Sequence, residues 1–119
     1  MHVTLASLFR LVLLMFLVSF IHPDGRSETH NVQCGDTVLD CALDNNVEGI
    51  VGQCGGACNC CTCHCYVDKP WLAFLTDKIQ DEVDLLEYAI EPRPNSRLAC
   101  QIVMTQEIDG ITVFLPRKQ

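Results

Sequence analysis

Six of the nine cysteines in this chain of 119 residues fall in one short segment, Cys54–Cys65. A cysteine-rich chain of this size is either a secreted disulfide framework or a metal protein of a reducing compartment. Nine is an odd number, so complete pairing leaves one thiol over. Adjacent cysteines such as Cys60 and Cys61 are also poorly placed to bridge one another. The clustering therefore favours a polynuclear metal site over disulfides.

Length and charge limit the remaining possibilities. The chain is long enough for one compact domain and too short for two ordinary ones. Hydrophobic residues make up 49% of it, and its formal net charge is −7. A strongly acidic chain argues against nucleic-acid binding, which needs a basic surface. It suits a partner that presents lysine and arginine and is found by electrostatic steering.

The first half of the chain predicts a hairpin and a helix. The sequence His22-Pro-Asp-Gly is typical of a turn and separates two strand-like runs, Phe16–Ile21 and Arg26–Val32. Residues Thr37–Asn45 have helical periodicity. The apolar face of this expected helix comprises Val38, Leu39, Ala42 and Leu43.

The second half predicts a loop, a helix and three strands. Segment Gly49–Cys63 has no helical or strand period and is rich in glycine, which indicates a loop. A helix is expected at Lys78–Ala89, where an apolar stripe repeats at helical spacing. That stripe comprises Ile79, Val83, Leu86 and Ile90. The strands are expected at His64–Val67, Leu98–Thr105 and Ile111–Leu115, the last two joined by a turn at Asp109-Gly110.

This order of elements predicts an α+β domain. It is compatible with a β-grasp (ubiquitin-like) mixed sheet that carries a long cluster-binding loop.

The spacing Cys54-x5-Cys60-x2-Cys63-x36-Cys100 is the most informative motif. Three cysteines on one loop and a fourth far along the chain are a usual arrangement for a [2Fe–2S] cluster. A zinc ribbon prefers two separated C-x2-C pairs. Small residues let backbone amides approach the cluster sulfurs, and His64 is expected to organise the loop through hydrogen bonds. The expected supporting residues are Gly55, Gly56, Ala57, Thr62 and His64.

Two segments around these cysteines, Cys54–His64 and Arg93–Ile102, resemble the adrenodoxin and putidaredoxin family of ferredoxins. The later run Glu107–Val113 is similar to the bacterial branch, and the resemblance extends from about Phe20 to Gln119. Plant-type ferredoxins differ, because they place four residues between the first two ligands.

The resemblance implies a β-grasp fold and one [2Fe–2S] cluster in an electron carrier that is not an enzyme. The implied ligands are Cys54, Cys60, Cys63 and Cys100. The usual electron donor in this family is an NAD(P)H-dependent flavoprotein reductase, and the acceptor is often a cytochrome P450. A related branch serves iron–sulfur cluster assembly, which is the first alternative function.

Three further cysteines depart from the family pattern. Cys58, Cys61 and Cys65 stand where relatives more often have Ser, Ala or Val, and the pair Cys58 and Cys61 offers an alternative ligand set. With Cys34 and Cys41, they are interpreted as small apolar residues without a ligand role. A zinc-stabilised binding module without redox activity is the second alternative function.

Five acidic residues recur at helical spacing and have no interleaved cations to balance them. Like charges at i, i+4 cost stability, so the pattern favours a docking surface for a basic partner over a merely solvated face. In the resembled family this helix is where the reductase and the P450 dock. The residues are Asp77, Asp81, Asp84, Glu87 and Glu91.

The apolar segment Met1–Ile21 is interrupted by Arg10 and matches neither of two common explanations. A signal peptide carries its charge at the start and ends in a small-residue cleavage motif. A membrane anchor needs about 20 apolar residues. We therefore expect residues 1–14 to be an extension, from a start codon assigned too early or a genuine anchor, and residues 15–119 to be the ferredoxin domain. The expected location is the cytoplasm, with membrane association only if residues 1–21 are an anchor.

Expression from Met15 should give protein with a full cluster, because Met15–Ile21 is long enough for a typical strand. Visible absorption of the purified protein checks this, and intact-mass measurement of the native product should find a start near Met15. A native product that keeps Met1 and fractionates with membranes would establish the anchor instead.

Overall fold

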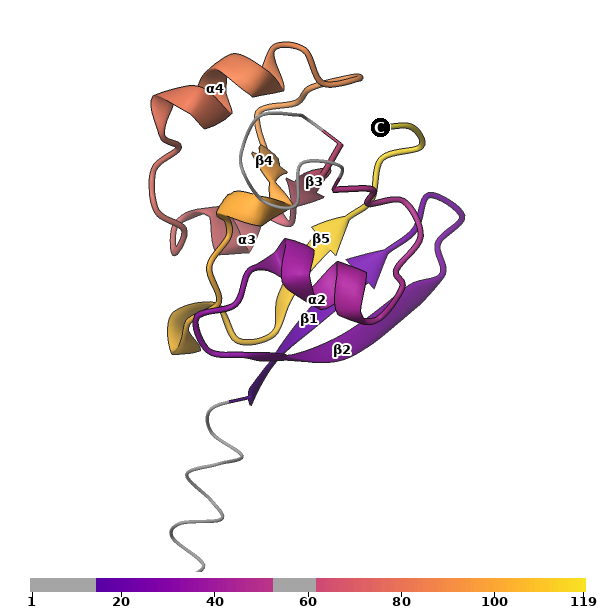
Figure 1. The fold of residues 1–119 in the computed structure, drawn as a ribbon, viewed down its shortest axis with the longest axis vertical. Helices are drawn as coiled ribbons and strands as arrows, with labels where there is room; N and C mark the ends of the chain where they lie inside the picture. Colours follow the sequence, from indigo (N-terminus) through magenta and orange to yellow (C-terminus); the bar gives the residue numbers. More distant parts are fainter. Residues whose placement is uncertain (1–14, 53–61) are drawn as a thin grey trace, which may run out of the picture.

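The computed structural model describes residues 15–52 and 62–119 of the chain. They form a five-stranded mixed sheet of order β2-β1-β5-β3-β4 (Figure 1). The strands are β1 (Met15–Ile21), β2 (Ser27–Gln33), β3 (His64–Val67), β4 (Ser96–Leu98) and β5 (Ile111–Phe114). Strand β5 is parallel to β1, whereas the other neighbours are antiparallel. The expected α+β fold with a β-grasp sheet is confirmed.

Strands β1 and β2 form the predicted hairpin. In β1 the side chains of Phe16, Val18 and Phe20 are buried, while those of Met15 and Leu17 are exposed. This alternation is the period of two that turns one face of a strand to the core. At the turn, the Gly25 amide donates to the His22 carbonyl at 2.9 Å, and Gly25 has a φ of 90° that a side chain would disfavour.

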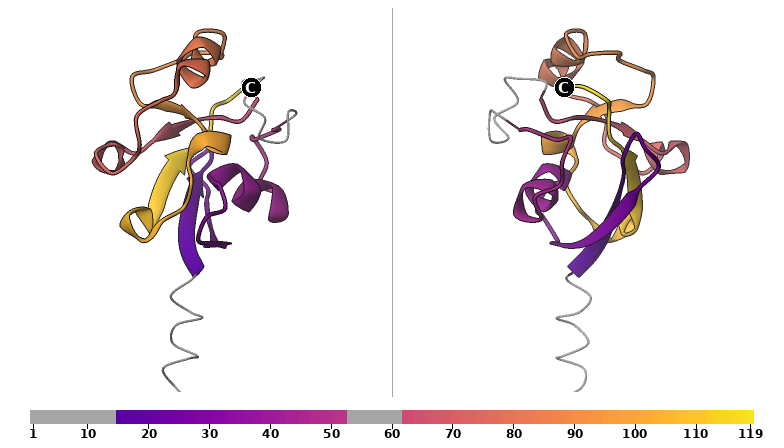
Figure 2. Two further views of the ribbon diagram at one scale, coloured as in Figure 1. Left: turned by 60° about the vertical axis from the view of Figure 1, so that its left-hand side comes forward. Right: turned by 90° about the vertical axis from the view of Figure 1, so that its right-hand side faces the viewer.

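Helix α2 (Val38–Asp44) lies across one face of the sheet (Figures 1 and 2). A capping box begins it, because Thr37 Oγ1 accepts from the Asp40 amide at 3.1 Å and Asp40 Oδ2 accepts from the Thr37 amide at 2.9 Å. The prediction that Leu43 belongs to the apolar face is wrong, since it is 43% exposed and Cys41 is buried instead. The buried arc of the helix ends at Ala42.

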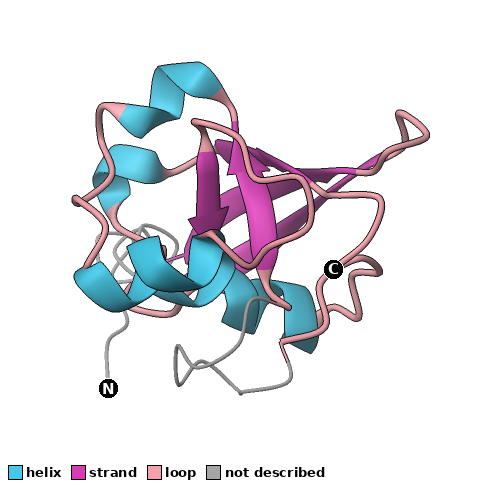
Figure 3. Ribbon diagram, turned by 90° about the horizontal axis from the view of Figure 1, so that it is seen from above, coloured by secondary structure: helices cyan, strands magenta, loops and turns pink. Residues whose placement is uncertain are grey.

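The remaining helices flank the strands (Figure 3). Helix α3 (Lys69–Leu72) was not expected, and α4 (Gln80–Leu86) is shorter than the predicted helix at 78–89. The predicted apolar stripe of α4 is also wrong. Of its residues only Leu86 is buried, whereas Ile79, Val83 and Ile90 are exposed. The helix turns Glu82 and Leu86 inward.

The inward turn of α4 is explained by a buried ion pair. The carboxylate of Glu82 accepts hydrogen bonds from Arg97 Nε at 2.7 Å and Arg97 Nη2 at 3.0 Å, and from the Leu98 amide at 2.8 Å. Glu82 is fully buried, and Arg97 also donates to the Thr76 carbonyl at 3.0 Å. These bonds offset the cost of burying the two charges and fix α4 against β4.

The predicted strand at 98–105 is wrong, because β4 ends at Leu98 and a 3₁₀ turn, Ala99–Gln101, follows. The Leu98 amide is taken by Glu82 and the Ala99 amide by the Cys63 carbonyl. The turn at Asp109-Gly110 does not close a hairpin either. It leads from a second 3₁₀ turn, Gln106–Ile108, into β5, which enters the sheet between β1 and β3.

Replacing Glu82 with Gln should destabilise the protein strongly, because it leaves the Arg97 guanidinium buried without its counter-charge. Removing one partner of a buried pair costs about 3–5 kcal/mol, which for a domain of this size lowers the melting temperature by roughly 10 °C or more. Circular dichroism at a fixed scan rate measures this. The matched control is Glu87→Gln, an exposed acid next to the same helix. Equal melting temperatures for both variants would contradict the structural role of the pair.

Candidate metal centre

The pairing of β3 with β4 brings together two cysteines separated by 36 residues. His64 lies opposite Leu98 in the antiparallel register, and the Ala99 amide donates to the Cys63 carbonyl at 3.0 Å. The 3₁₀ turn then carries Cys100 back toward Cys63, and their side chains hydrogen-bond. Cys63 is fully buried and Cys100 is 6% exposed. The structure thus joins one end of the predicted cluster loop to its distant ligand.

The protonation of Cys63 shows what this site requires. The hydrogen bond that the Cys63 thiol donates to Cys100, together with burial, raises the pKa of Cys63 far above its ordinary value. The thiol is therefore protonated at neutral pH unless a positive charge is supplied. A coordinated metal supplies that charge and converts a thiol to a thiolate.

The donor set fits an iron–sulfur cluster. Thiolates are soft ligands that suit such clusters, and amide donors to the ligand sulfurs stabilise their negative charge. Gln101 Nε2 donates to Cys100 Sγ at 3.5 Å. This contact is a donor of the required kind beside a predicted ligand.

Only two of the four predicted ligands, Cys63 and Cys100, lie within the described residues. Within residues 15–52 and 62–119, no group of three His, Cys, Asp or Glu side chains is arranged to hold a metal ion. The other two predicted ligands, Cys54 and Cys60, lie outside these ranges, as do the predicted supporting residues Gly55, Gly56 and Ala57. Cys58 and Cys61, the alternative pair, also fall there.

Two predicted supporting residues, Thr62 and His64, lie within the described part of the chain. The Thr62 carbonyl accepts from the Val51 amide at 3.0 Å and from the Gly52 amide at 3.4 Å. The His64 ring is buried, and its Nε2 shares a hydrogen bond of 2.7 Å with Ser96 Oγ. Burial and the Arg93 charge lower the pKa of His64, so the ring is neutral at pH 7. Among the described residues its Nδ1 has no hydrogen-bond partner.

The described cysteines outside the pair differ in exposure. Cys41 and Cys65 are buried, as expected for small apolar residues, whereas Cys34 is exposed. Burial raises the pKa of Cys41 to about 11 and that of Cys65 to about 12. Both thiols are therefore neutral at physiological pH.

The five predicted docking acids are all exposed, but they do not share one helix face. Helix α4 contains only Asp81 and Asp84, with Glu87 as its C-terminal capping residue. Asp77 precedes the helix, and Glu91 follows it with a left-handed φ of 54°. The expectation of a single continuous stripe is wrong because the helix ends at Leu86. The acids instead follow the helix and its two flanking segments.

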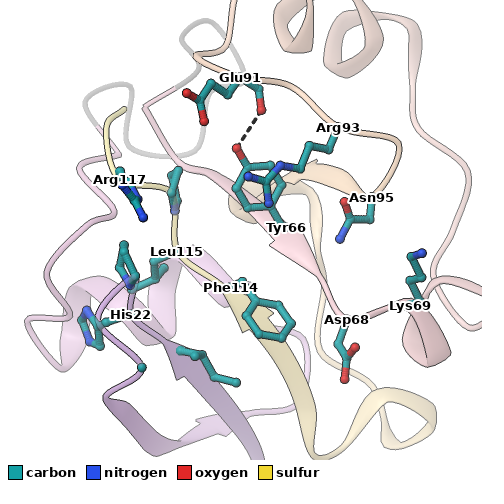
Figure 4. A pocket seen from close by; sticks show the side chains of 14 residues that line it. His22, Tyr66, Asp68, Lys69, Glu91, Arg93, Asn95, Phe114, Leu115 and Arg117 are labelled. Carbon is teal, nitrogen blue, oxygen red and sulfur yellow. Dashed lines mark hydrogen bonds between the residues drawn. The ribbon is translucent and has the colours of Figure 1, made fainter.

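A cavity of about 570 Å³ lies between the hairpin turn, β3 and the segment after β5. Figure 4 shows Lys69, Arg93 and Arg117 around it, together with the acids Asp68 and Glu91. Within it, Tyr66 Oη donates to the Glu91 carbonyl at 2.7 Å and the Arg93 guanidinium lies 4.3 Å from the Tyr66 ring centroid. Neither Cys63 nor Cys100 lines the cavity. No sequence motif marks it, since its residues come from four separate segments.

Sequence reasoning also missed Gln119. Its side chain hydrogen-bonds the backbone of His64, the residue directly after Cys63. A single glutamine beyond the last strand gives no pattern that could have identified this contact.

No helix in the part of the chain that the structure describes has both the length and the hydrophobicity to cross a membrane.

Comparisons with known proteins also indicate an iron–sulfur site. A family model for the 2Fe-2S iron-sulfur cluster binding domain matches residues 21–105. Rhodocoxin of Rhodococcus erythropolis is 38% identical over 103 residues, which covers 86% of this chain and 96% of rhodocoxin.

Solved structures agree in fold as well. A ferredoxin from Rhodopseudomonas palustris HaA2 is 45% identical, with a TM-score of 0.85 over 87% of this chain and 98% of that one. A chain of the covalent putidaredoxin reductase–putidaredoxin complex is 39% identical, with a TM-score of 0.81 over 84% of this chain and 97% of that one. With two buried cysteines brought together between β3 and β4, these matches show that the chain belongs to the adrenodoxin- and putidaredoxin-type [2Fe–2S] ferredoxins, a family of one-electron carriers.

Proposed function

We propose that this ferredoxin holds its [2Fe–2S] cluster through Cys54, Cys60, Cys63 and Cys100, and carries electrons from an NAD(P)H-dependent flavoprotein reductase to a cytochrome P450-type monooxygenase. The observation that carries the proposal is the buried pair of Cys63 and Cys100, with an amide donor on Cys100. The family resemblance supplies the other two ligands. When bound, the cluster accepts and releases one electron at a time.

The described residues prepare the site for this role in three ways. Burial of Cys63 and Cys100 keeps water from their sulfurs. The bond from the Ala99 amide to the Cys63 carbonyl fixes the spacing of the two ligands before a cluster binds. The Gln101 amide stabilises negative charge on Cys100 Sγ. A site held in place in this way needs little rearrangement when its charge changes by one electron.

The acidic segment from Asp77 to Glu91 is the proposed docking surface for both protein partners. Its five predicted acids are exposed and lie on α4 or in the segments beside it, and α4 packs against β4, the strand that precedes Cys100. A cationic partner steered to this surface would therefore approach the predicted cluster. The solved putidaredoxin reductase–putidaredoxin complex supports a flavoprotein reductase as one such partner.

We further propose that residues 15–119 act as one cytoplasmic ferredoxin domain without nucleic-acid partners. The alternative function, electron supply to iron–sulfur cluster assembly, uses the same cluster with a different acceptor. This function is favoured if the protein reduces no P450-type enzyme.

Alanine at any of the four proposed ligands should abolish the red-brown colour and the rhombic S = 1/2 EPR signal of the one-electron-reduced protein, because an iron loses a thiolate. The matched controls are Cys58→Ser, Cys61→Ala and Cys65→Val, which should keep both signals. Bleaching by Cys58→Ser alone would show that the ligand set is wrong. A colourless wild-type protein with stoichiometric zinc after anaerobic reconstitution would end the proposal.

Reversing the charges of Asp81, Asp84 and Glu87 to lysine should slow reduction by the reductase several-fold, with an unchanged cluster spectrum. The wild-type rate should fall with added salt, because the Debye length shrinks to about 8 Å near 0.15 M. Stopped-flow absorption measures both effects.

A matched control makes the same change in net charge elsewhere, at the exposed acids Asp44, Glu48 and Glu107. If this control slows reduction as much as the first triple variant, net charge explains the effect and the docking surface does not.

A further inference from the structure

The side-chain amide of Gln119 makes three hydrogen bonds to backbone groups. Its Oε1 accepts from the His64 amide at 3.1 Å, and its Nε2 donates to the His64 carbonyl at 2.8 Å and to the Gly49 carbonyl at 2.7 Å. A primary amide has one acceptor oxygen and two N–H donors, so this arrangement uses both kinds of group at once. We call these three bonds the Gln119 clamp.

The chain leading to the clamp is itself held in place. After β5, the Leu115 amide donates to the Ile21 carbonyl at 2.8 Å, and the side chain of Leu115 is buried. A Cβ atom on Gly49 would lie 3.4 Å from Leu115 Cδ1, so the Leu115 side chain packs directly on the backbone that the clamp binds. Gln119 therefore approaches from a segment that already packs against Gly49, which limits the entropy lost when its side chain is ordered.

The clamp lies where two segments run side by side. The Val51 and Gly52 amides both donate to the Thr62 carbonyl, which joins residues 49–52 to residues 62–64. Gln119 adds a second connection between the same segments, from Gly49 to His64. His64 directly follows Cys63, a proposed cluster ligand, so the backbone on one side of that ligand is fixed by Gln119. The carbonyl of Cys63, in the same peptide unit as the His64 amide, accepts from the Ala99 amide, so this unit is held from two directions.

We infer that Gln119 is a positioning residue for the cluster, which acts by holding the backbone beside Cys63. The inference rests on the proposed role of Cys63 as a ligand and extends it to a residue beyond the last strand. The clamp opposes local separation of residues 49–52 from residues 62–64. It thereby slows loss of the cluster and sets the hydrogen bonding and water access that tune the reduction potential.

The test compares Gln119→Met with the wild-type holoprotein. Methionine keeps the length and neutrality of the side chain but makes none of the three bonds. The matched control is Gln106→Met, the same change at an exposed glutamine in a different turn. Three quantities are measured: the rate of bleaching by an iron chelator, the midpoint potential, and deuterium uptake by mass spectrometry in peptides 62–67 and 27–33.

Gln119→Met should bleach roughly ten-fold faster, which corresponds to a loss of about 1.4 kcal/mol of stabilisation. Its potential should shift from the wild-type value, and peptide 62–67 should take up deuterium faster while peptide 27–33 is unchanged. Gln106→Met should match wild type throughout. Gln119→Glu should also bleach faster, because a carboxylate keeps the acceptor but places negative charge against two carbonyls.

Two results would overturn the inference. Bleaching and potential equal to wild type in Gln119→Met would show that the clamp does not position the cluster. Faster uptake in both peptides with an unchanged potential would reduce Gln119 to a contributor to general stability. If the wild-type protein is red-brown and either result is obtained, only the proposed role of Gln119 is rejected. If the wild-type protein is colourless, both the proposed cluster and the role of Gln119 are rejected.

Discussion

The buried carboxylate of Glu82 is the interaction that holds α4 against β4, the strand that leads to Cys100. It is fully buried, and it binds both the Arg97 side chain and the Leu98 amide at the end of β4. Strand β4 lies at the edge of the sheet, and the carboxylate occupies the amide that would otherwise be open to a further strand. The 3₁₀ turn that follows places Cys100 against Cys63. A buried charge pair therefore holds α4 on the edge strand, directly before the turn that carries Cys100.

The pairing of β3 with β4 also sets the chemistry of the two cysteines. Their burial excludes water, and the hydrogen bond between them keeps Cys63 protonated. Ionising these buried thiols costs free energy when no cation is near. Ionisation becomes favourable once a metal supplies positive charge. The Gln101 amide already contacts Cys100 Sγ, and the Ala99 amide already fixes the backbone carbonyl of Cys63. The protein thus supplies geometry and polarity, while the cluster supplies the redox chemistry.

The helix α4 shows where sequence reasoning reached its limit. The apolar stripe indicated a buried face through Ile79 and Val83, yet these residues are exposed and Glu82 is buried. A glutamate is normally assigned to the solvent face because an unpaired buried carboxylate is very costly. Only the position of Arg97, fifteen residues away on another element, removes that cost. The face that α4 buries was therefore decided by a partner that local periodicity does not reveal.

The sequence by itself determined the family, the hairpin, the capped helix α2, the strand β3 and the nature of the donor atoms. These features follow from local signals, chiefly turn chemistry, helical periodicity and cysteine spacing. Tertiary structure alone decided the parallel pairing of β5 with β1, the end of β4 at Leu98, the cavity around Tyr66 and the contact of Gln119 with His64. Each of these depends on groups far apart in the chain, whose hydrogen bonds and charges are matched only when the fold brings them together.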